Sequence, residues 1–404
     1  MKKNLYDVII VGAGIVGLAT AYQIINYYKK IRLAIIEKEN EVAKHQSGRN
    51  SGVIHSGIYY KPNSLKAKNC VNGYKLLINF CLENNVPFKI CGKLIIASNE
   101  KELETLNLLY ERGIANGLSK IKLIDSNEIN AIEPHVKGIK ALYVPYTGVI
   151  DYRLVCLKLK ELLLQKNVDF YFSEEVIKIK ENLEHVKVIT KKGNIYETSI
   201  LITCAGLFSD KLAKQSFNKL DFRIIPFKGK YYILDEKGQS LINSLVYQVP
   251  DLNFPFLGIH ISKHIGNIVT IGPNAFLVLK REGYKKFSFS FTDVFNILTW
   301  KGFYKMAYKH LKLGIKELYL GTNKNGFIKE AKKILPLLEK ENLLPYNNPG
   351  IRAQICTRNG TLFDDFLILN TNRVLHVCNA PSPAATASFS IGNHILDNLL
   401  NLKS

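Results

Sequence analysis

The sequence lacks any uninterrupted apolar run of about 18 residues, the length at which a helix can cross a bilayer. Its seven cysteines are odd in number, scattered and without a C-x-x-C pair. That distribution argues against a disulfide framework or a zinc site and fits free thiols in a reducing compartment. We therefore expect a cytoplasmic protein that binds no metal. Internal repeats and low-complexity linkers are absent as well.

Acidic residues are scarce. Asp and Glu number 34 against 55 Lys and Arg, which gives a formal net charge of +21. A balance of this kind points to acidic small molecules, anionic membrane surfaces or nucleic acid as partners. Lys, Asn, Ile and Tyr are frequent throughout the chain, however, so nucleotide bias in the source genome is the favoured explanation. No nucleic-acid partner is expected, because no recognition helix or RNA-binding motif is evident.

At 404 residues, with 47% hydrophobic and 22% charged residues, the chain is long enough for an enzyme of two connected domains. The segment YDVIIVGAGIVGLATAYQIINYYKKIRLAIIEKE predicts a strand, a tight turn, a helix and a second strand. Its run VIIV is typical of a strand that is buried on both faces.

The turn in this segment has the pattern G-x-G-x-x-G. Gly12 permits the bend, Gly14 lets the backbone approach a pyrophosphate, and Gly17 lets helix and strand pack closely. The helix N-terminus adds a partial positive charge. Glu37 follows after about 20 residues, where an acid can accept both hydroxyls of an adenosine ribose. NAD and FAD both fit the predicted dinucleotide site, which comprises Gly12, Ala13, Gly14, Ile15, Val16, Gly17, Glu37 and Lys38.

Further elements follow along the chain. Residues 64–84 predict a helix with Leu65, Leu76, Leu77 and Phe80 on one face. GKLIIAS, EEVIKIK, HVKVITKKG and ILITCAG predict strands, and the region 221–344 predicts strands followed by a basic helical stretch. The implied architecture is a discontinuous nucleotide domain (1–88, 145–215 and 346–404) with a second, largely β domain (89–144 and 216–345) inserted between its pieces.

Five stretches together resemble one family: VGAGIVGLA, SGRNSGVIHSGIYY, CAG, GIRAQ and NAPSPAATAS. They are similar to motifs of FAD-dependent oxidoreductases of the D-amino-acid oxidase class. Within that class, PFLGIHISKHIGNIVTIGPNAFLVLKREGY and TGVIDY look most like the L-2-hydroxyglutarate oxidases and dehydrogenases. The resemblance implies an α/β fold, with a doubly wound, Rossmann-like FAD-binding domain and an inserted mixed β-sheet substrate domain. It also implies oxidation of L-2-hydroxyglutarate to 2-oxoglutarate, with electrons passed to a membrane quinone or to oxygen.

The resemblance makes FAD the expected cofactor. Small residues in SGRNSG would let the chain run against it, and Arg49 and Asn50 would anchor polar edges. A helix that begins in NAPSPAATAS would stabilise the negative charge that gathers on the flavin during reduction. The additional cofactor-binding residues that we expect are Ser47, Gly48, Arg49, Asn50, Ser51, Gly52, Val176, Ala205, Gly206, Ser209, Pro383, Ala384, Ala385 and Thr386.

Oxidation of a 2-hydroxy acid also needs a base for the hydroxyl proton. His55 lies in the stretch that the resemblance places along the flavin, and His260 lies in a period-2 strand that could face it across the substrate. The two remain alternative bases. The substrate is a dicarboxylate, so cations and hydroxyl donors are expected around it. The candidates are Tyr60, Lys228, Tyr231, Arg281 and Arg352.

The segment FNILTWKGFYKMAYKHLKLGIKELYLG interleaves aromatic residues, among them Trp300, with lysines. A basic, aromatic, amphipathic helix of this kind can lie on an anionic bilayer, so we predict peripheral attachment at the inner face of the cell membrane, beside the quinone pool. A packed helix with a solvated lysine face is the alternative. For the reaction, the alternative is an amino-acid or sarcosine-type oxidase that produces peroxide.

Overall fold

The computed structural model describes residues 5–251, 258–285 and 287–403. Its first sheet has eight strands, in the order β10-β11-β12-β1-β2-β9, with β21 beside β12 and β20 beside β21. The run VIIV forms the buried centre of this sheet, because β1 pairs in parallel with both β2 and β12. The strands are β1 (Leu5–Val11), β2 (Leu33–Ile36), β9 (Asp169–Tyr171), β10 (Val176–Glu181), β11 (Val186–Thr190), β12 (Ile195–Thr203), β20 (Leu367–Asn370) and β21 (Val374–Asn379).

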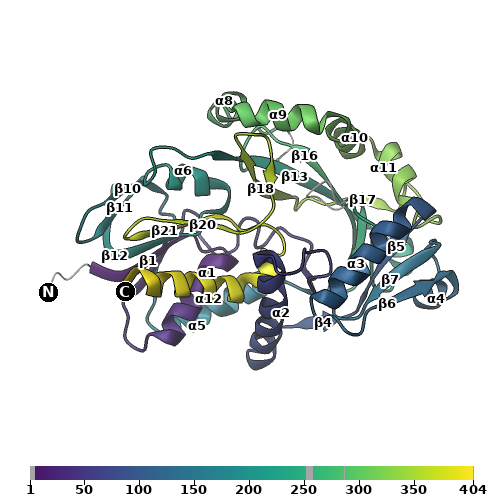
Figure 1. Cartoon of the computed structure of the whole chain (residues 1–404), viewed down its shortest axis with the longest axis horizontal. Coiled ribbons are helices and arrows are strands. Elements are labelled where there is room, and N and C mark those ends of the chain that lie inside the picture. Colours follow the sequence, from purple (N-terminus) through teal and green to yellow (C-terminus); the bar gives the residue numbers. More distant parts are fainter. Residues whose placement is uncertain (1–4, 252–257, 286, 404) are drawn as a thin grey trace.

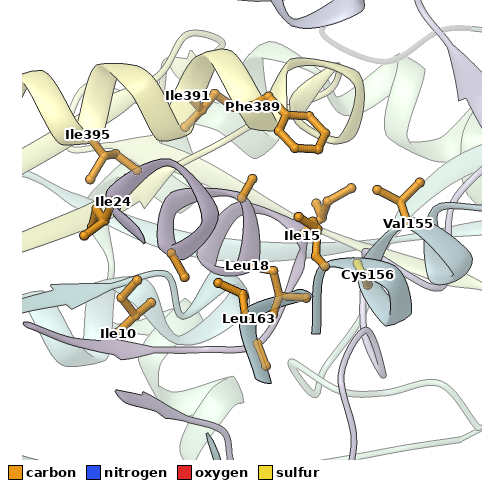
Figure 2. Close-up of a cluster of buried hydrophobic side chains, with 14 of the residues drawn as sticks. Ile10, Ile15, Leu18, Ile24, Val155, Cys156, Leu163, Phe389, Ile391 and Ile395 are labelled. Carbon is orange, nitrogen blue, oxygen red and sulfur yellow. The ribbon is translucent and has the colours of Figure 1, made fainter. Parts of the chain in front are cut away.

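Helices α1 (Ile15–Tyr27), α5 (Tyr152–Gln165) and α12 (Ala384–Lys403) pack together against this sheet. Figure 2 shows the core between them: Ile10 of β1 and Leu18 of α1 meet Leu163 of α5, and Phe389 of α12 closes the other side. These side chains are fully or almost fully buried. The first and last segments of the chain are therefore joined in one core.

The second sheet has ten strands and is mixed, with only the pairing of β14 and β5 parallel among those described. Its order is β19-β18-β13-β16-β15-β14-β5-β7-β6, with β17 beside β13. Its strands are β5 (Lys93–Ala97), β6 (Lys122–Asp125), β7 (Lys140–Val144), β13 (Phe222–Leu234), β14 (Leu245–Gln248), β15 (His260–Lys263), β16 (Val269–Leu277), β17 (Leu343–Pro345), β18 (Gly350–Thr357) and β19 (Leu362–Phe363).

A small sheet of β3 (Val53–Ile54), β8 (Gly148–Ile150) and β4 (Phe88–Ile90) lies where the chain passes between the two large sheets. The other helices are α2 (Leu65–Glu83), α3 (Leu103–Ala115), α4 (Ser126–Ile132), α6 (Ser209–Ala213), α7 (Glu236–Ser240), α8 (Phe291–Leu298), α9 (Lys301–Lys309), α10 (Leu311–Thr322) and α11 (Lys324–Ala331). Short 3-10 helices span Glu100–Glu102 and Gly206–Phe208.

These sheets confirm the predicted α/β class with a mixed second sheet. The expected division differs from sheet membership at one place: residues 346–404 were assigned to the first domain, but β18 and β19 belong to the second sheet, because β18 pairs along β13. The expected face of α2 was also partly wrong. Leu77 and Phe80 are buried, whereas Leu65 at the start of the helix is exposed.

The basic segment after β16 forms three successive helices, α8 to α10, along the outer edge of the molecule (Figure 1). Large apolar side chains on it are exposed, including Phe291 at 83% and Tyr308 at 86%. Trp300, expected among these surface aromatics, is instead 5% exposed and its ring N–H donates to the carbonyl of Cys356. Within the described ranges, no helix is both long and apolar enough to cross a bilayer.

The packing of α2 against α12 depends on a glycine. A Cβ on Gly73 would lie 2.5 Å from the Cα of Ala387 and 2.8 Å from the carbonyl oxygen of Thr386. Both are backbone atoms, which cannot move aside as a flexible side chain can. Gly73 thus sets how closely α2 approaches the first turns of α12.

We predict that Gly73→Ala lowers the free energy of unfolding by about 1–3 kcal/mol, because it forces the two helices apart. Gly314→Ala in α10 is the matched control: apart from its chain neighbours and the backbone of its own helix, no heavy atom of the described residues lies within 4 Å of the added Cβ. That change should stabilise the protein by about 0.5–1 kcal/mol, since Ala favours the helix. Urea unfolding of both variants measures the difference, and equal stabilities would contradict the close approach.

Candidate functional site

One continuous cavity of about 910 Å³ extends from the α1 turn to the second sheet. This volume lies within the roughly 300–1,000 Å³ typical of ligand pockets. The parts of the chain that line it include the β1–α1 turn, the segment between β2 and α2, the end of β12, strands β13, β15 and β18, and the start of α12. Residues of both large sheets therefore face a single space.

The three motif glycines differ in where they lie relative to this cavity. Gly12 has a φ of +108°, and a Cβ there would lie 2.4 Å from the Cys204 carbonyl oxygen. A Cβ on Gly17 would lie 2.1 Å from the carbonyl oxygen of Gly12, so Gly17 serves helix packing and does not line the cavity. A Cβ on Gly14 would approach only the hydroxyl of Ser47, at 3.2 Å, and Gly14 lines the cavity.

Glu37 lies at the end of β2 beside this turn. Its carboxylate accepts hydrogen bonds from the backbone N–H groups of Ala13, at 2.7 Å, and Glu39, at 2.9 Å. A carboxylate has about four acceptor sites, so two such bonds leave capacity for further donors. Ala13 itself does not line the cavity; its backbone fixes Glu37 instead. Ile15, Val16, Glu37 and Lys38 do line it.

The stretch from residue 47 to 52 borders the cavity but only partly as expected. Ser47 accepts a hydrogen bond from the Ile15 N–H at 2.9 Å and so supports the first turn of α1. Gly48 and Gly52 do not line the cavity. Both positions need glycine because neighbouring backbone lies too close for a side chain. An added Cβ would lie 2.3 Å from the Ala43 carbonyl oxygen at Gly48 and 2.8 Å from the Ile150 carbonyl oxygen at Gly52. Ser47, Arg49, Asn50 and Ser51 line the cavity.

The start of α12 approaches the same space. The Thr386 hydroxyl is 2.7 Å from the hydroxyl of Tyr152 and accepts a hydrogen bond from the backbone N–H of His55 at 3.1 Å. Ser209 was expected here, but it does not line the cavity, since its buried hydroxyl donates to the carbonyl of Cys378. The expected residues that line this part are Val176, Ala205, Gly206, Pro383, Ala384, Ala385 and Thr386.

Both candidate histidines line the cavity, His55 from the end of β3 and His260 from β15. His260 is 4% exposed, stacks on Tyr247 with ring centroids 4.2 Å apart, and has Nδ1 3.1 Å from the carbonyl oxygen of Gly258. A carbonyl only accepts, so Nδ1 carries the proton and Nε2 is the acceptor. Burial, Lys93 and His260 lower the pKa of His55 to about 3, and burial likewise lowers the pKa of His260 to about 3. Both imidazoles are therefore neutral at neutral pH.

The expected substrate cations divide into two groups. Arg352, on β18, lines the cavity together with Tyr60 and Tyr231. Burial lowers the pKa of the Arg352 guanidinium, while Tyr231 and Glu317 act in the opposite direction. An arginine nevertheless remains charged in proteins. The cavity thus contains a fixed positive charge beside two tyrosine rings.

Arg281 and Lys228 do not line the cavity, which corrects their expected role. The Arg281 guanidinium is buried and donates to both carboxylate oxygens of Asp210, with Nη2 2.8 Å from one of them. Lys228 donates to the carbonyl oxygens of Gly283, at 2.9 Å, and Tyr284, at 2.7 Å. Arg281 thus joins its loop to α6, and Lys228 holds the loop at Gly283 and Tyr284.

Several cavity residues were not found from the sequence. Tyr152 lies in the recognised TGVIDY motif, which was the one available signal for it. Lys66 lines the cavity and donates to Asp364 at 2.6 Å. Lys93 is buried directly beneath the cavity and bonds the Tyr59 hydroxyl. Since Lys93 starts an ordinary strand, no pattern marked it.

A cluster of charged side chains borders the end of the cavity at which Glu37 lies. The ligand atoms of Glu39, His45 and Glu282 lie within 4.8 Å of one another, an arrangement that could hold a metal ion. The Lys38 ammonium already pairs with both carboxylates, at 2.6 Å from Glu282. Burial lowers the pKa of Lys38, but Glu282 and Glu39 outweigh it and hold that pKa above its ordinary value. The lysine thus supplies the positive charge of this cluster.

Comparison with known proteins agrees with this geometry. The family model "FAD dependent oxidoreductase" matches residues 7–397. An L-2-hydroxyglutarate dehydrogenase of Indibacter alkaliphilus is 44% identical, over 97% of this chain and 98% of the relative. The Escherichia coli K12 protein of that name is 39% identical, over 98% of this chain and 94% of the relative.

Solved structures show the same fold. L-α-glycerophosphate oxidase from Mycoplasma pneumoniae, with FAD bound, is 26% identical with a TM-score of 0.80, covering 97% of this chain and 94% of that one. Glycine oxidase from Geobacillus kaustophilus is 18% identical with a TM-score of 0.73, covering 98% and 94%. FAD fits the cavity described above, in which Gly14 leaves open space beside a helix N-terminus and Glu37 retains free acceptor sites. The chain belongs to the FAD-dependent oxidoreductase family, and FAD is its cofactor.

Proposed function

We propose that this protein oxidises L-2-hydroxyglutarate to 2-oxoglutarate. The observation that carries the proposal is the meeting of two neutral histidines and the half-buried Arg352 in the cavity that also contains the FAD-type glycine turn. The L-2-hydroxyglutarate dehydrogenases that match nearly the whole chain support the choice of substrate. When bound, FAD supplies the acceptor for the hydride from C2.

The cofactor would be held by the lining residues of the first sheet. Gly14 and the first turn of α1 would face the pyrophosphate, and Glu37 would accept the ribose hydroxyls. Arg49, Ser51 and Val176 would add contacts along the molecule. The start of α12 would present its N-terminal partial charge to the flavin, because Ala385 and Thr386 line the cavity there.

The substrate would lie between this region and the second sheet. A neutral imidazole of the pair His55 and His260 accepts the hydroxyl proton as the C2 hydride leaves, and burial keeps both in the accepting form. Arg352 binds one carboxylate, with Tyr60 and Tyr231 as hydroxyl donors. The histidine that is not the proton acceptor would help to orient the substrate.

For the electron acceptor, we propose that α8 to α10 attach the protein to the inner face of the cell membrane, where quinone is available. Phe295 and Leu311 are 68% and 55% exposed, and lysines such as Lys301 and Lys305 are exposed beside them. Exposed apolar and cationic side chains together favour an anionic bilayer over water. Oxygen is the alternative acceptor.

Anaerobic addition of L-2-hydroxyglutarate to the purified flavoprotein should bleach its flavin absorbance and yield 2-oxoglutarate. D-2-hydroxyglutarate, glycine, sarcosine and proline should not bleach it. Bleaching by an amine substrate, with none by L-2-hydroxyglutarate, would instead establish the amino-acid or sarcosine-type oxidase.

In the same assay, asparagine replaces each histidine in turn. The variant that lacks the proton acceptor should reduce its flavin roughly 10²–10⁴-fold more slowly at saturating substrate, because general base catalysis is lost. The other variant should mainly weaken substrate binding. His135→Asn is the control, since that exposed side chain lies outside the cavity. Unchanged rates in both cavity variants would exclude the proposed proton transfer.

Vesicles of phosphatidylcholine with added phosphatidylglycerol should co-sediment the protein at low salt, and vesicles without the anionic lipid should do so weakly. The double variant Phe291→Ser, Phe295→Ser should lose this association. Leu183→Ser removes an equally exposed apolar side chain, 90% exposed, from a turn in the first domain and should not affect it. A protein that stays in the supernatant with both vesicle types does not attach to membranes in this way.

A further inference from the structure

Lys93 begins β5 and is an unusually placed cation. Its side chain is long and normally solvated, yet the residue is 1% exposed. The ammonium lies 4.3 Å from the centre of the Tyr59 ring and 4.8 Å from that of the Tyr247 ring. It donates a hydrogen bond to the Tyr59 hydroxyl at 3.3 Å. Two aromatic faces and one hydroxyl thus take the place of water around it.

No carboxylate among the described residues pairs with Lys93. All ion pairs that these residues form involve other cations. Aromatic faces stabilise a desolvated ammonium by less than its removal from water costs. The protein surroundings of Lys93 therefore offset only part of the free-energy cost of burying its charge.

The residues that hold Lys93 are themselves cavity residues. Tyr59 and Tyr247 both line the cavity, and Tyr247 stacks on His260. Lys93 contributes to the lowered pKa of His55 and of His260, which places its charge close to both. The lysine is thus one side-chain layer away from the space that the substrate would occupy.

We propose that Lys93 acts through Tyr59 on a carboxylate of the bound dianion, and that binding of the dianion brings a proton onto Lys93. This inference rests on the proposed function. When the ammonium donates to the Tyr59 oxygen, the phenolic proton is free to be donated toward the cavity. The substrate carboxylate accepts a hydrogen bond from the Tyr59 hydroxyl, and its negative charge compensates the positive charge of Lys93. Lys93 is a positioning residue in this scheme, because it reaches the substrate only through Tyr59.

The protonation state of Lys93 makes this coupling measurable. Burial lowers the pKa of Lys93 to about 7, with a small opposing effect from Cys70. Above pH 7 the free protein therefore holds mostly the neutral amine, and an arriving dianion raises the pKa and draws in a proton. At pH 6 the site is already mostly protonated, so uptake is small there. Proton uptake on binding of the dianion should therefore increase from pH 6 to pH 8.

The other titratable groups around Lys93 do not produce this signal. Burial raises the pKa values of Tyr59, Tyr247 and Cys70 far above 8. The pKa values of His55 and His260, about 3, lie far below it. Proton uptake at pH 8 therefore reports on Lys93.

The experiment titrates the FAD-loaded protein with 2-oxoglutarate, which binds without being oxidised, by calorimetry at pH 6 and pH 8 in two buffers of different ionisation enthalpy. The wild type should take up close to one proton at pH 8 and much less at pH 6. Lys93→Met should take up none, and its dissociation constant at pH 7 should rise roughly tenfold to a hundredfold, as for loss of a charged hydrogen bond. Lys93→Arg should bind at pH 8 without uptake, because its charge is permanent.

Two controls isolate the effect. Lys122→Met removes an exposed lysine from β6 of the same sheet and should leave uptake and affinity unchanged. Tyr59→Phe should weaken binding while the flavin content stays normal, since only the hydroxyl is lost. If Lys93→Met fails to fold, the wild-type difference between pH 6 and pH 8 still decides the question.

Two failures can be told apart. If L-2-hydroxyglutarate bleaches the flavin and 2-oxoglutarate binds with no proton uptake at pH 8, the role of Lys93 is overturned and the proposed function stands. Proton uptake by Lys93→Met equal to that of the wild type would likewise overturn the role of Lys93 and leave the proposed function standing. If neither compound binds, the proposed function falls, and the inference falls with it.

Discussion

The close contact between the β1–α1 turn and the end of β12 is the constraint on which the cavity depends. Gly12 lies against the Cys204 carbonyl, and Gly17 lies against Gly12, so strand, turn and helix meet without side chains between them. With this approach, the α1 N-terminus is open toward the cavity at Gly14. Because α1 also packs on α5 and α12, the same contact fixes where the start of α12 lies (Figure 2).

Strand β18 connects this region to the second sheet. It pairs along β13, which makes it part of that sheet, yet Gly350 at its start lies against the backbone of Arg49, beside the FAD-binding region. Two residues further, Arg352 faces the cavity. One strand therefore sets the distance between Arg49 and Arg352 within the cavity lining. A domain division drawn from sequence segments alone could not show this, because pairing partners are not visible in a linear chain.

The sequence predicted the parts of the site whose chemistry is local. The glycine turn and Glu37 follow from spacing, and the helix after Pro383 follows from its proline start; Gly14, Glu37 and Ala384 all line the cavity. Arg281 was expected to bind the substrate but pairs with Asp210, which is 71 positions away. Residue type shows what a side chain can bind but not which partner the fold brings to it. Lys93 was missed for the same reason, since the rings that bury it come from distant segments.

The charges around the cavity also bear on the choice between a hydroxy acid and an amino acid. An amino-acid substrate would bring its own ammonium close to Arg352 and Lys93, with the neutral rings of His55 and His260 as neighbours. Like charges at such distances repel, most strongly where water is excluded. A hydroxy acid carries no cation, and the second carboxylate of 2-hydroxyglutarate adds attraction. Arg352, and Lys93 in its protonated form, thus favour a dianion on both counts.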